Sequence, residues 1–176
     1  MSSNHKQPNI WKGMLVGLIA GLAAAWTMDR FQDVWLAVSP PDDSEKKKDE
    51  GRASADDEES QDDATVKAAS AISEGLFEHK LSRAEKKIAG PAVHYAVGAT
   101  SGIVYGIASE FLPAVTMGFG LPYGTAFWLV VDEGAVPLLR FSKPPTAYPA
   151  STHIYALASH LMFGATAEGV RRLLRG

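Results

Sequence analysis

The chain has 176 residues, of which 46% are apolar, and a formal net charge of −3. This acidic balance argues against nucleic-acid binding, and the absence of cysteine excludes disulfides, thiolate metal sites and cysteine nucleophiles. Four long stretches carry almost no charge, near residues 13–28, 88–109, 111–131 and 144–167. A helix that spans the hydrocarbon core of a bilayer, about 30 Å thick, needs ~20 mostly apolar residues. The sequence therefore predicts an all-α, polytopic membrane protein with four transmembrane helices.

Residues 1–38 are expected to hold an N-terminal tail and the first transmembrane helix. Lys12 and the small residues Ala23–Ala25 together resemble a secretory signal with its cleavage site. The apolar helical pattern nevertheless continues past that point to Trp35. We therefore expect this segment to stay attached as a membrane-spanning helix.

Residues 39–65 carry eleven carboxylates against four cations. A segment with this composition cannot bury enough apolar surface to offset its ordering entropy, so we predict a disordered acidic loop. Residues 66–89 follow with a broken apolar stripe beside several lysines and arginines. That pattern predicts amphipathic helices on the membrane surface; a polar connecting hairpin is the alternative.

The second half of the surface segment carries clear helix boundaries. Ser82 and Glu85 have the spacing of a capping box, so a helix should restart at Arg83. Gly90 and Pro91 should then break it, with Pro91 in the first turn of the next helix. Residues 90–176 are predicted to form a three-helix transmembrane region, with helices at about 91–110, 115–139 and 150–172.

Glycines recur at four-residue spacing in three of the four predicted helices. They are Gly13, Gly17 and Gly21 in the first, Gly98, Gly102 and Gly106 in the second, and Gly120 and Gly124 in the third. Helices in lipid associate through close van der Waals contact, which small residues permit. We therefore predict helices packed through glycine-rich faces. Packing within one chain and packing between the chains of a homo-oligomer both remain open.

Ionisable groups inside a bilayer cost free energy and are therefore candidates for function. The candidates are six histidine or acidic residues and one tyrosine: His94, Tyr105, Asp132, Glu133, His153, His160 and Glu168. His153 and His160 share a helix face but lie ~10.5 Å apart along the axis, too far to chelate one ion. A polar seam that passes protons is one interpretation. The other is that each side chain fixes helix packing through hydrogen bonds.

The depth of two of these candidates in the bilayer stays open. Asp132 and Glu133 reach the headgroups if the third helix ends at Asp132, and lie deeper if it continues to Leu139. Glu168, with the arginines that follow it, is expected to form a charge cluster at a helix end. A metal site would have to be assembled from different helices, for example from His94, His160 and Glu133, and we expect none.

A further pattern lies between His94 and Leu174. It consists of Tyr105-Gly106, Glu110, Pro113, Pro137-Leu138, Pro144-Pro145, His160, Glu168 and Arg171-Arg172. In these residues the chain resembles the YagU-like inner-membrane proteins, a bacterial family of unknown molecular function. The acidic loop departs from that pattern. The resemblance implies a multi-pass protein of the bacterial cytoplasmic membrane with a link to acid resistance, and it supplies no reaction and no catalytic residues.

Two functions follow from these observations. The first is a non-enzymatic membrane protein that supports envelope or acid-stress physiology. The second is an oligomeric, proton-linked transporter or channel that uses the polar seam. No nucleophile elbow, phosphate loop or zinc-protease motif occurs in the sequence, so we expect no catalytic activity and no cofactor. The expected partner is the lipid bilayer. Cations near the helix ends favour termini outside and loops in the cytoplasm.

Overall fold

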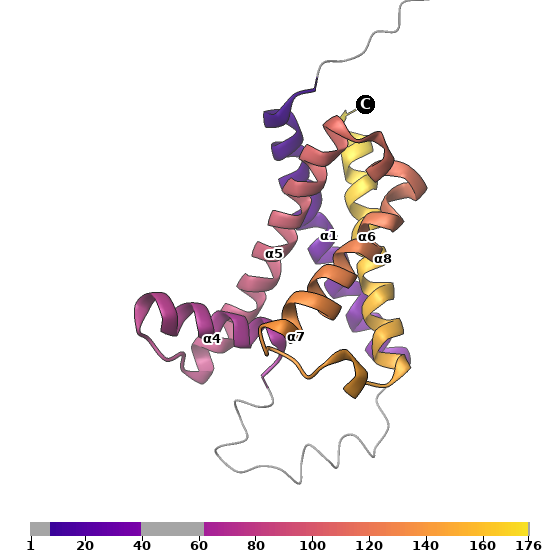
Figure 1. Ribbon diagram of the computed structural model, residues 1–176. Coiled ribbons are helices and arrows are strands. Elements are labelled where there is room, and N and C mark those ends of the chain that lie inside the picture. Colours follow the sequence, from indigo (N-terminus) through magenta and orange to yellow (C-terminus); the bar gives the residue numbers. More distant parts are fainter. Residues whose placement is uncertain (1–7, 40–61, 176) are drawn as a thin grey trace, which may run out of the picture.

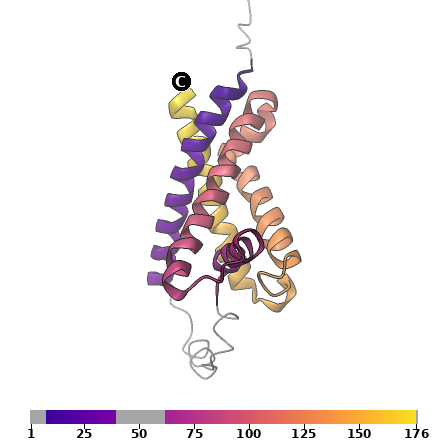
Figure 2. The same cartoon turned by 90° about the vertical axis from the view of Figure 1, so that its left-hand side faces the viewer.

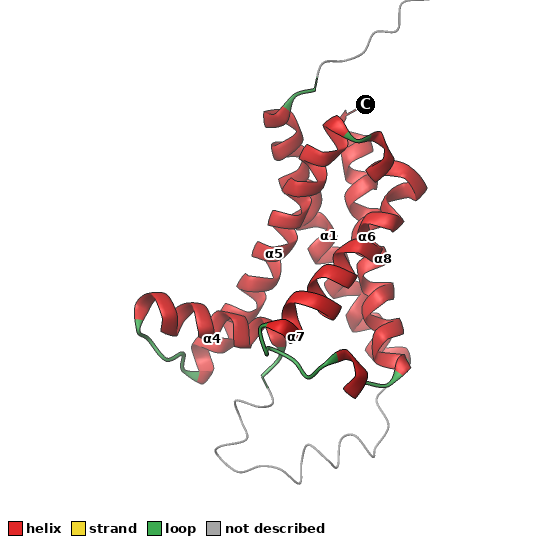
Figure 3. Ribbon diagram, in the orientation of Figure 1, coloured by secondary structure: helices red, strands yellow, loops and turns green. Residues whose placement is uncertain are grey.

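The computed structural model describes residues 8–39 and 62–175, and within these ranges the protein is all-helical (Figure 1, Figure 3). The helices are α1 (Ile10–Val38), α4 (Ala64–Phe77), α5 (Arg83–Phe111), the 3₁₀ helix η1 (Pro113–Gly120), α6 (Leu121–Val130), the π-helical turn η2 (Val131–Ala135), α7 (Val136–Leu138), the 3₁₀ turn η3 (Pro145–Ala147) and α8 (Ala150–Arg175). This confirms the all-α prediction. The acidic loop falls mainly on residues 40–61, which lie outside the described ranges.

The long helices run up and down beside one another. α1 packs against α5 and against α8, and α8 packs against α6. α1 begins and α8 ends at the same end of the molecule (Figure 1). α4 packs on α5 and lies crosswise at the opposite end (Figure 1, Figure 2). We call this second end, where α4, α7 and η3 lie, the loop end.

Glycines face each other where α1 meets α5. A methyl group added to Gly13 would lie 2.9 Å from the carbonyl oxygen of Gly106, and one added to Gly17 would overlap the carbonyl of Gly102. The α6–α8 contact has the same construction, because a methyl group on Gly124 would overlap the carbonyl of His160. At each of these two contacts, the helix backbones therefore approach more closely than larger side chains would allow.

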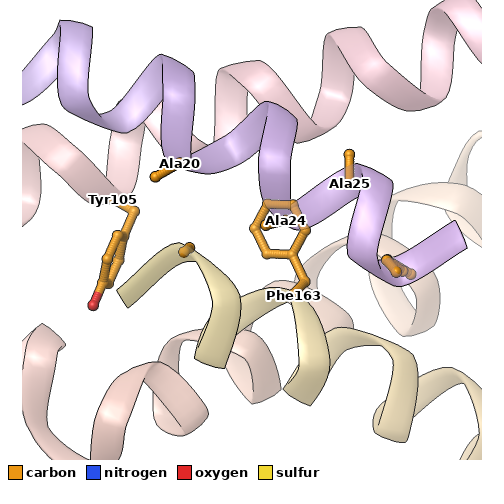
Figure 4. Close-up of a cluster of buried hydrophobic side chains, with 7 residues drawn as sticks. Ala20, Ala24, Ala25, Tyr105 and Phe163 are labelled. Carbon is orange, nitrogen blue, oxygen red and sulfur yellow. The ribbon is translucent and has the colours of Figure 1, made fainter. Parts of the chain in front are cut away.

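The core is small and built around alanines. Ala20, Ala24 and Ala25 of α1 are fully buried, beside Tyr105 of α5 and Phe163 of α8. The Phe163 ring lies against α1 at Ala24 (Figure 4). Because small side chains line α1, the two aromatic rings can fill the space between three helices.

α5 runs unbroken through Gly90 and Pro91, where the sequence predicted a break. A residue before proline avoids the helical region mainly because its Cβ meets the proline ring, and glycine has no Cβ. Gly90 also admits α4, since a Cβ there would lie 2.7 Å from Val66. The capping box of Ser82 and Glu85 is confirmed at the start of the helix.

The third predicted helix, 115–139, begins later than expected. Met117, Gly118 and Phe119 have non-helical backbone angles, and the straight helix α6 starts at Leu121. Gly118 and Gly120 both have positive φ, of 58° and 79°, which is the conformation glycine adopts at little cost. These angles reverse the chain between α5 and α6.

Two helices of the described residues, Ile10–Val38 and Pro113–Leu138, are long and apolar enough to cross a membrane, where the sequence predicted four. α5 and α8 do not meet the same test because glycine, serine, tyrosine and histidine lower their mean hydropathy and charges lie near their ends. In the most apolar stretch of Pro113–Leu138, 11% of the residues are buried inside the molecule.

Candidate functional site: a cavity lined by histidine–carboxylate pairs

A cavity of about 1650 Å³ lies at the loop end. Its walls come from α1, α5, α6 with η2, and α8, and residues of α4 and of the loop after α7 also line it. Five of the seven predicted site residues, His94, Asp132, Glu133, His153 and His160, line this one space. A cavity with a few converging polar groups is the usual form of a small-molecule site.

The π-helical turn η2 carries two of the acidic groups. Its defining contact is the Val136 amide, which donates to the carbonyl of Val131. Pro137 has no amide hydrogen, so the carbonyl of Glu133 lacks its ordinary helical partner and the chain is free to widen here. Both Asp132 and Glu133 line the cavity. Single π turns inside α-helices are frequent at functional sites.

Glu133 pairs with His153 of α8. The distance from His153 Nδ1 to Glu133 Oε1 is 2.6 Å, and Nε2 lies 3.1 Å from the carbonyl oxygen of Pro145. A carbonyl only accepts hydrogen bonds, so Nε2 donates, and Nδ1 shares a proton with the carboxylate. This pair can therefore hold a proton between two side chains that line the cavity.

A second pair joins α5 to α1. His94 Nε2 lies 3.0 Å from Asp29 Oδ1, and the hydroxyl of Tyr95 donates to Asp29 Oδ2 at 2.8 Å. Asp29 therefore uses both oxygens to bind the neighbouring helix. The sequence analysis did not select Asp29 or Tyr95, because nothing local links Asp29 to the His94–Tyr95 pair, 65 residues further along the chain.

The third pair is looser. His160 is buried and its Nδ1 donates to the carbonyl of Ala156 at 2.9 Å, while Asp132 Oδ2 lies 3.7 Å from the same nitrogen. That separation is beyond hydrogen-bond distance. Asp132 therefore faces the cavity with its oxygens less occupied than those of Asp29 or Glu133.

Glu168 belongs to a different group at the other end of α8. Its side chain is fully buried and accepts hydrogen bonds from Tyr105 at 2.6 Å, from Arg171 at 2.6 and 2.9 Å, and from Arg172 at 2.6 Å. The expected charge cluster at the helix end is present, but its carboxylate lies in the interior and ties α8 to α5. Nearby, Glu110 pairs with Arg175 at 2.5 Å.

Aromatic rings separate these two groups. The rings of Tyr105 and Tyr123 lie 4.6 Å apart, those of Tyr123 and Phe127 6.4 Å, and those of Phe127 and His160 5.1 Å. Phe127 carries no hydrogen-bonding group, whereas the hydroxyl of Tyr123 bonds to Ser101. The structure therefore divides the predicted seam into a cavity group (His94, Asp132, Glu133, His153 and His160) and a closed group around Tyr105 and Glu168.

Within residues 8–39 and 62–175, no group of three or more histidine and acidic side chains is arranged to hold a metal ion. His94, His160 and Glu133, the combination considered from sequence, each bind a different partner. The cavity group is suited to binding protons and positively charged groups.

Comparison with known families shows what the chain is similar to. Residues 69–169 match the family described as "Protein of unknown function (DUF1440)". No curated protein and no solved structure matches the chain. The matched range includes all five residues of the cavity group and both partners of the Tyr105–Glu168 contact.

Proposed function

The chain belongs to the DUF1440 family of unknown function, and from that premise we propose that it is a multi-pass protein of the bacterial cytoplasmic membrane, crossed by α1, α5, α6–α7 and α8. Its YagU-like sequence pattern further points to a role in envelope or acid-stress physiology. This role requires no catalysis. In this role, the packed helices hold the polar groups between them in fixed positions.

The observation that carries this proposal is the distribution of polarity. The interior holds Ser159, His160 and Glu168 in buried positions, whereas large apolar side chains are exposed on the outside. On α1 alone, Trp11 is 75% exposed and Leu15 63%. A soluble protein would bury such residues, but a protein in lipid turns them outward and keeps ionisable groups inside.

Helix length supports the same conclusion. α1 and α5 each have 29 residues and α8 has 26. At about 1.5 Å per residue each helix exceeds the ~30 Å of a hydrocarbon core. α5 and α8 are less apolar than α1, but some of the polar residues that lower their hydropathy contact other helices, as Tyr95 contacts Asp29 and Tyr105 contacts Glu168. The glycine-lined contact between α1 and α5 suits association in lipid.

α4 has the features of a helix on the membrane surface. Its Ile72, Leu76 and Phe77 are exposed, and it lies crosswise at the loop end (Figure 2). Lys80 and Lys87 follow nearby in the chain. Such a helix can lay its apolar side chains into the interface while cations meet lipid phosphates.

Cysteine accessibility tests the four crossings, since the chain has no cysteine of its own. Single variants Ser39→Cys and Ala114→Cys are labelled with a membrane-impermeant maleimide in intact and in permeabilised cells. Four crossings put these two positions on opposite sides of the membrane. If only Ile10–Val38 and Pro113–Leu138 cross, both positions lie on the same side, and the proposal is rejected.

The matched pair Ser142→Cys and Leu173→Cys supplies an internal check. Four crossings place these positions on opposite sides, and two crossings place them together. Extraction of wild-type protein from membranes by alkaline carbonate would also reject an integral location.

A second candidate, a proton-linked transporter or channel, is favoured by one observation. Three histidine–carboxylate pairs, drawn from α1, α5, η2 and α8, line a single cavity. Histidine titrates near neutral pH, so such pairs can take up and release protons. Phe127 separates this cavity from the Tyr105–Glu168 group, so transport would need that aromatic contact to open.

A further inference from the structure

The cavity group also carries an inference about a ligand, which goes beyond the membrane location and does not depend on proton transport. The charged side chains that line the cavity are Asp29, Arg30, Asp33, Asp62, Asp63, Lys67, Asp132, Glu133 and Lys143. Carboxylates outnumber the lysines and arginines by six to three. The local field therefore attracts positive charge.

Most of these carboxylates are already engaged. Asp33 pairs with Arg30 at 3.0 Å, Asp62 pairs with Lys86 at 2.5 Å, and Asp63 caps α4 by accepting from the Val66 amide at 2.9 Å. Asp29 and Glu133 hold the histidine contacts described above. Asp132 differs, because its nearest charged or titratable partner within the described residues is His160 at 3.7 Å.

His160 adds a second acceptor that lines the same cavity as Asp132. Its Nδ1 must donate, because its partner there is the carbonyl oxygen of Ala156. In the neutral ring, Nε2 is then the atom with the free lone pair, and within the described residues no hydrogen bond to Nε2 is found. The His160 side chain is 5% exposed, and it lines the cavity. An acceptor on the cavity wall without a protein donor favours a ligand that supplies one.

The walls around these acceptors are apolar. Phe127 and Phe163 lie 5.0 Å apart by ring centroid, and Phe127 stands edge-on to His160 at 5.1 Å. Both phenylalanines, with Val131 and Val136, line the cavity. Such walls suit a cation that carries a hydrocarbon part, and aromatic faces attract cations directly.

We propose that the cavity binds a small organic cation of the primary alkylammonium class, with its –NH₃⁺ group between Asp132 and His160 and its alkyl part against Phe127 and Phe163. An ammonium group brings three donors and a positive charge to a place that offers two acceptors. The π-helical turn η2 presents Asp132 to the cavity.

The test is calorimetric titration of the purified full-length protein in detergent with n-butylammonium chloride at pH 7.5. Empty micelles serve as the blank. n-Butanol and tetramethylammonium are titrated in parallel, since the first lacks the charge and the second lacks the N–H donors. We expect binding of n-butylammonium, and binding about tenfold weaker or more for each of the other two. Equal binding of n-butanol, or no binding of n-butylammonium, overturns the proposal.

Variants locate the site. Asp132→Asn should weaken n-butylammonium binding by about tenfold or more, whereas Asp33→Asn, which removes the same charge from a carboxylate paired with Arg30, should change it by less than about twofold. Equal effects of the two variants would show attraction by overall charge alone and reject the assigned position.

A readout on the wild-type protein covers the case in which Asp132→Asn does not fold. An alkylammonium probe that carries a diazirine is photolysed in the cavity, and the labelled peptide is identified by mass spectrometry. Labelling should fall within 127–136 or 156–163, and excess n-butylammonium should suppress it. Labelling elsewhere contradicts the proposal. These results are separate from the cysteine labelling, because a protein with two crossings could still bind the cation.

Discussion

The hydroxyl of Tyr105 donates to Glu168 Oε2 at 2.6 Å, across 63 residues of chain, and both side chains are fully buried. Removing that donor leaves a buried carboxylate with only its arginine partners. We expect Tyr105→Phe to lower the free energy of unfolding by about 1–2 kcal/mol. Thermal unfolding in detergent, followed by circular dichroism, measures the change.

Tyr148→Phe is the control for this variant, because the Tyr148 hydroxyl only accepts from the exposed backbone amide of Lys143 at 3.2 Å. Its unfolding temperature should stay near that of the wild type. Equal effects of the two substitutions would mean that the buried contact with Glu168 adds no particular stability.

The glycine contacts between α1 and α5 give a second prediction. A side chain at Gly102 would overlap the backbone of Gly17 and Gly21, so Gly102→Leu must push the helices apart. We expect it to lower the free energy of unfolding by about 3 kcal/mol. Gly75→Ala is the control, since nothing lies within 4 Å of the position of its Cβ, and it should stabilise α4 by about 0.5–1 kcal/mol. A folded, unchanged Gly102→Leu protein would contradict close packing.

The capping box at the start of α5 predicts a pH dependence. The pKa of Glu85 is lowered from 4.5 to about 2, chiefly by the hydrogen bond from the Ser82 side chain and also by the Ser82 backbone amide and by His79. A carboxyl whose pKa is lowered by folding contributes its stability in full above pH 4.5 and loses it as the pH falls through about 2. The first turn of α5 should therefore stay ordered at pH 4.

NMR titration of the Glu85 carboxyl carbon measures that pKa directly. In Ser82→Ala the largest cause of the shift is gone, so the midpoint should move upward toward 4.5. A midpoint that does not move would show that the Ser82 hydroxyl does not determine it.

The transport candidate predicts a loss of proton flux. Replacing His153 and His160 together by alanine removes one shared proton and one cavity acceptor while leaving the α1–α5 contact intact. If proton-linked transport is the function, wild-type liposomes should show flux under a pH gradient and the double variant should show none. Wild-type liposomes without flux at any gradient would reject that candidate.

The sequence was sufficient to predict features that depend on residues close together in the chain. The four-residue spacing of Gly98, Gly102 and Gly106 predicted one smooth face, and the structure sets that face against the glycines of α1. Ser82 and Glu85 lie three residues apart, so their capping box could be predicted from the sequence alone. Both features depend on neighbours along one helix.

Features that depend on distant residues could not be predicted. The charge cluster of Glu168 with the following arginines was predicted, but its burial against Tyr105 was not, because Tyr105 lies on another helix and no pattern in the sequence joins them. Asp29 was passed over for the same reason. Gly90 and Pro91 predicted a break because their usual effect is to end a helix, whereas here contact with α4 and the missing Cβ keep α5 continuous.

The aromatic layer of Tyr123 and Phe127 makes the two ends of the bundle unequal. A solute that enters from the loop end reaches His160 and then meets rings instead of a passage. It must leave through the mouth by which it came unless Phe127 turns aside. If the transport candidate holds, net movement would require this ring and its helix to rearrange, as in a carrier rather than a pore.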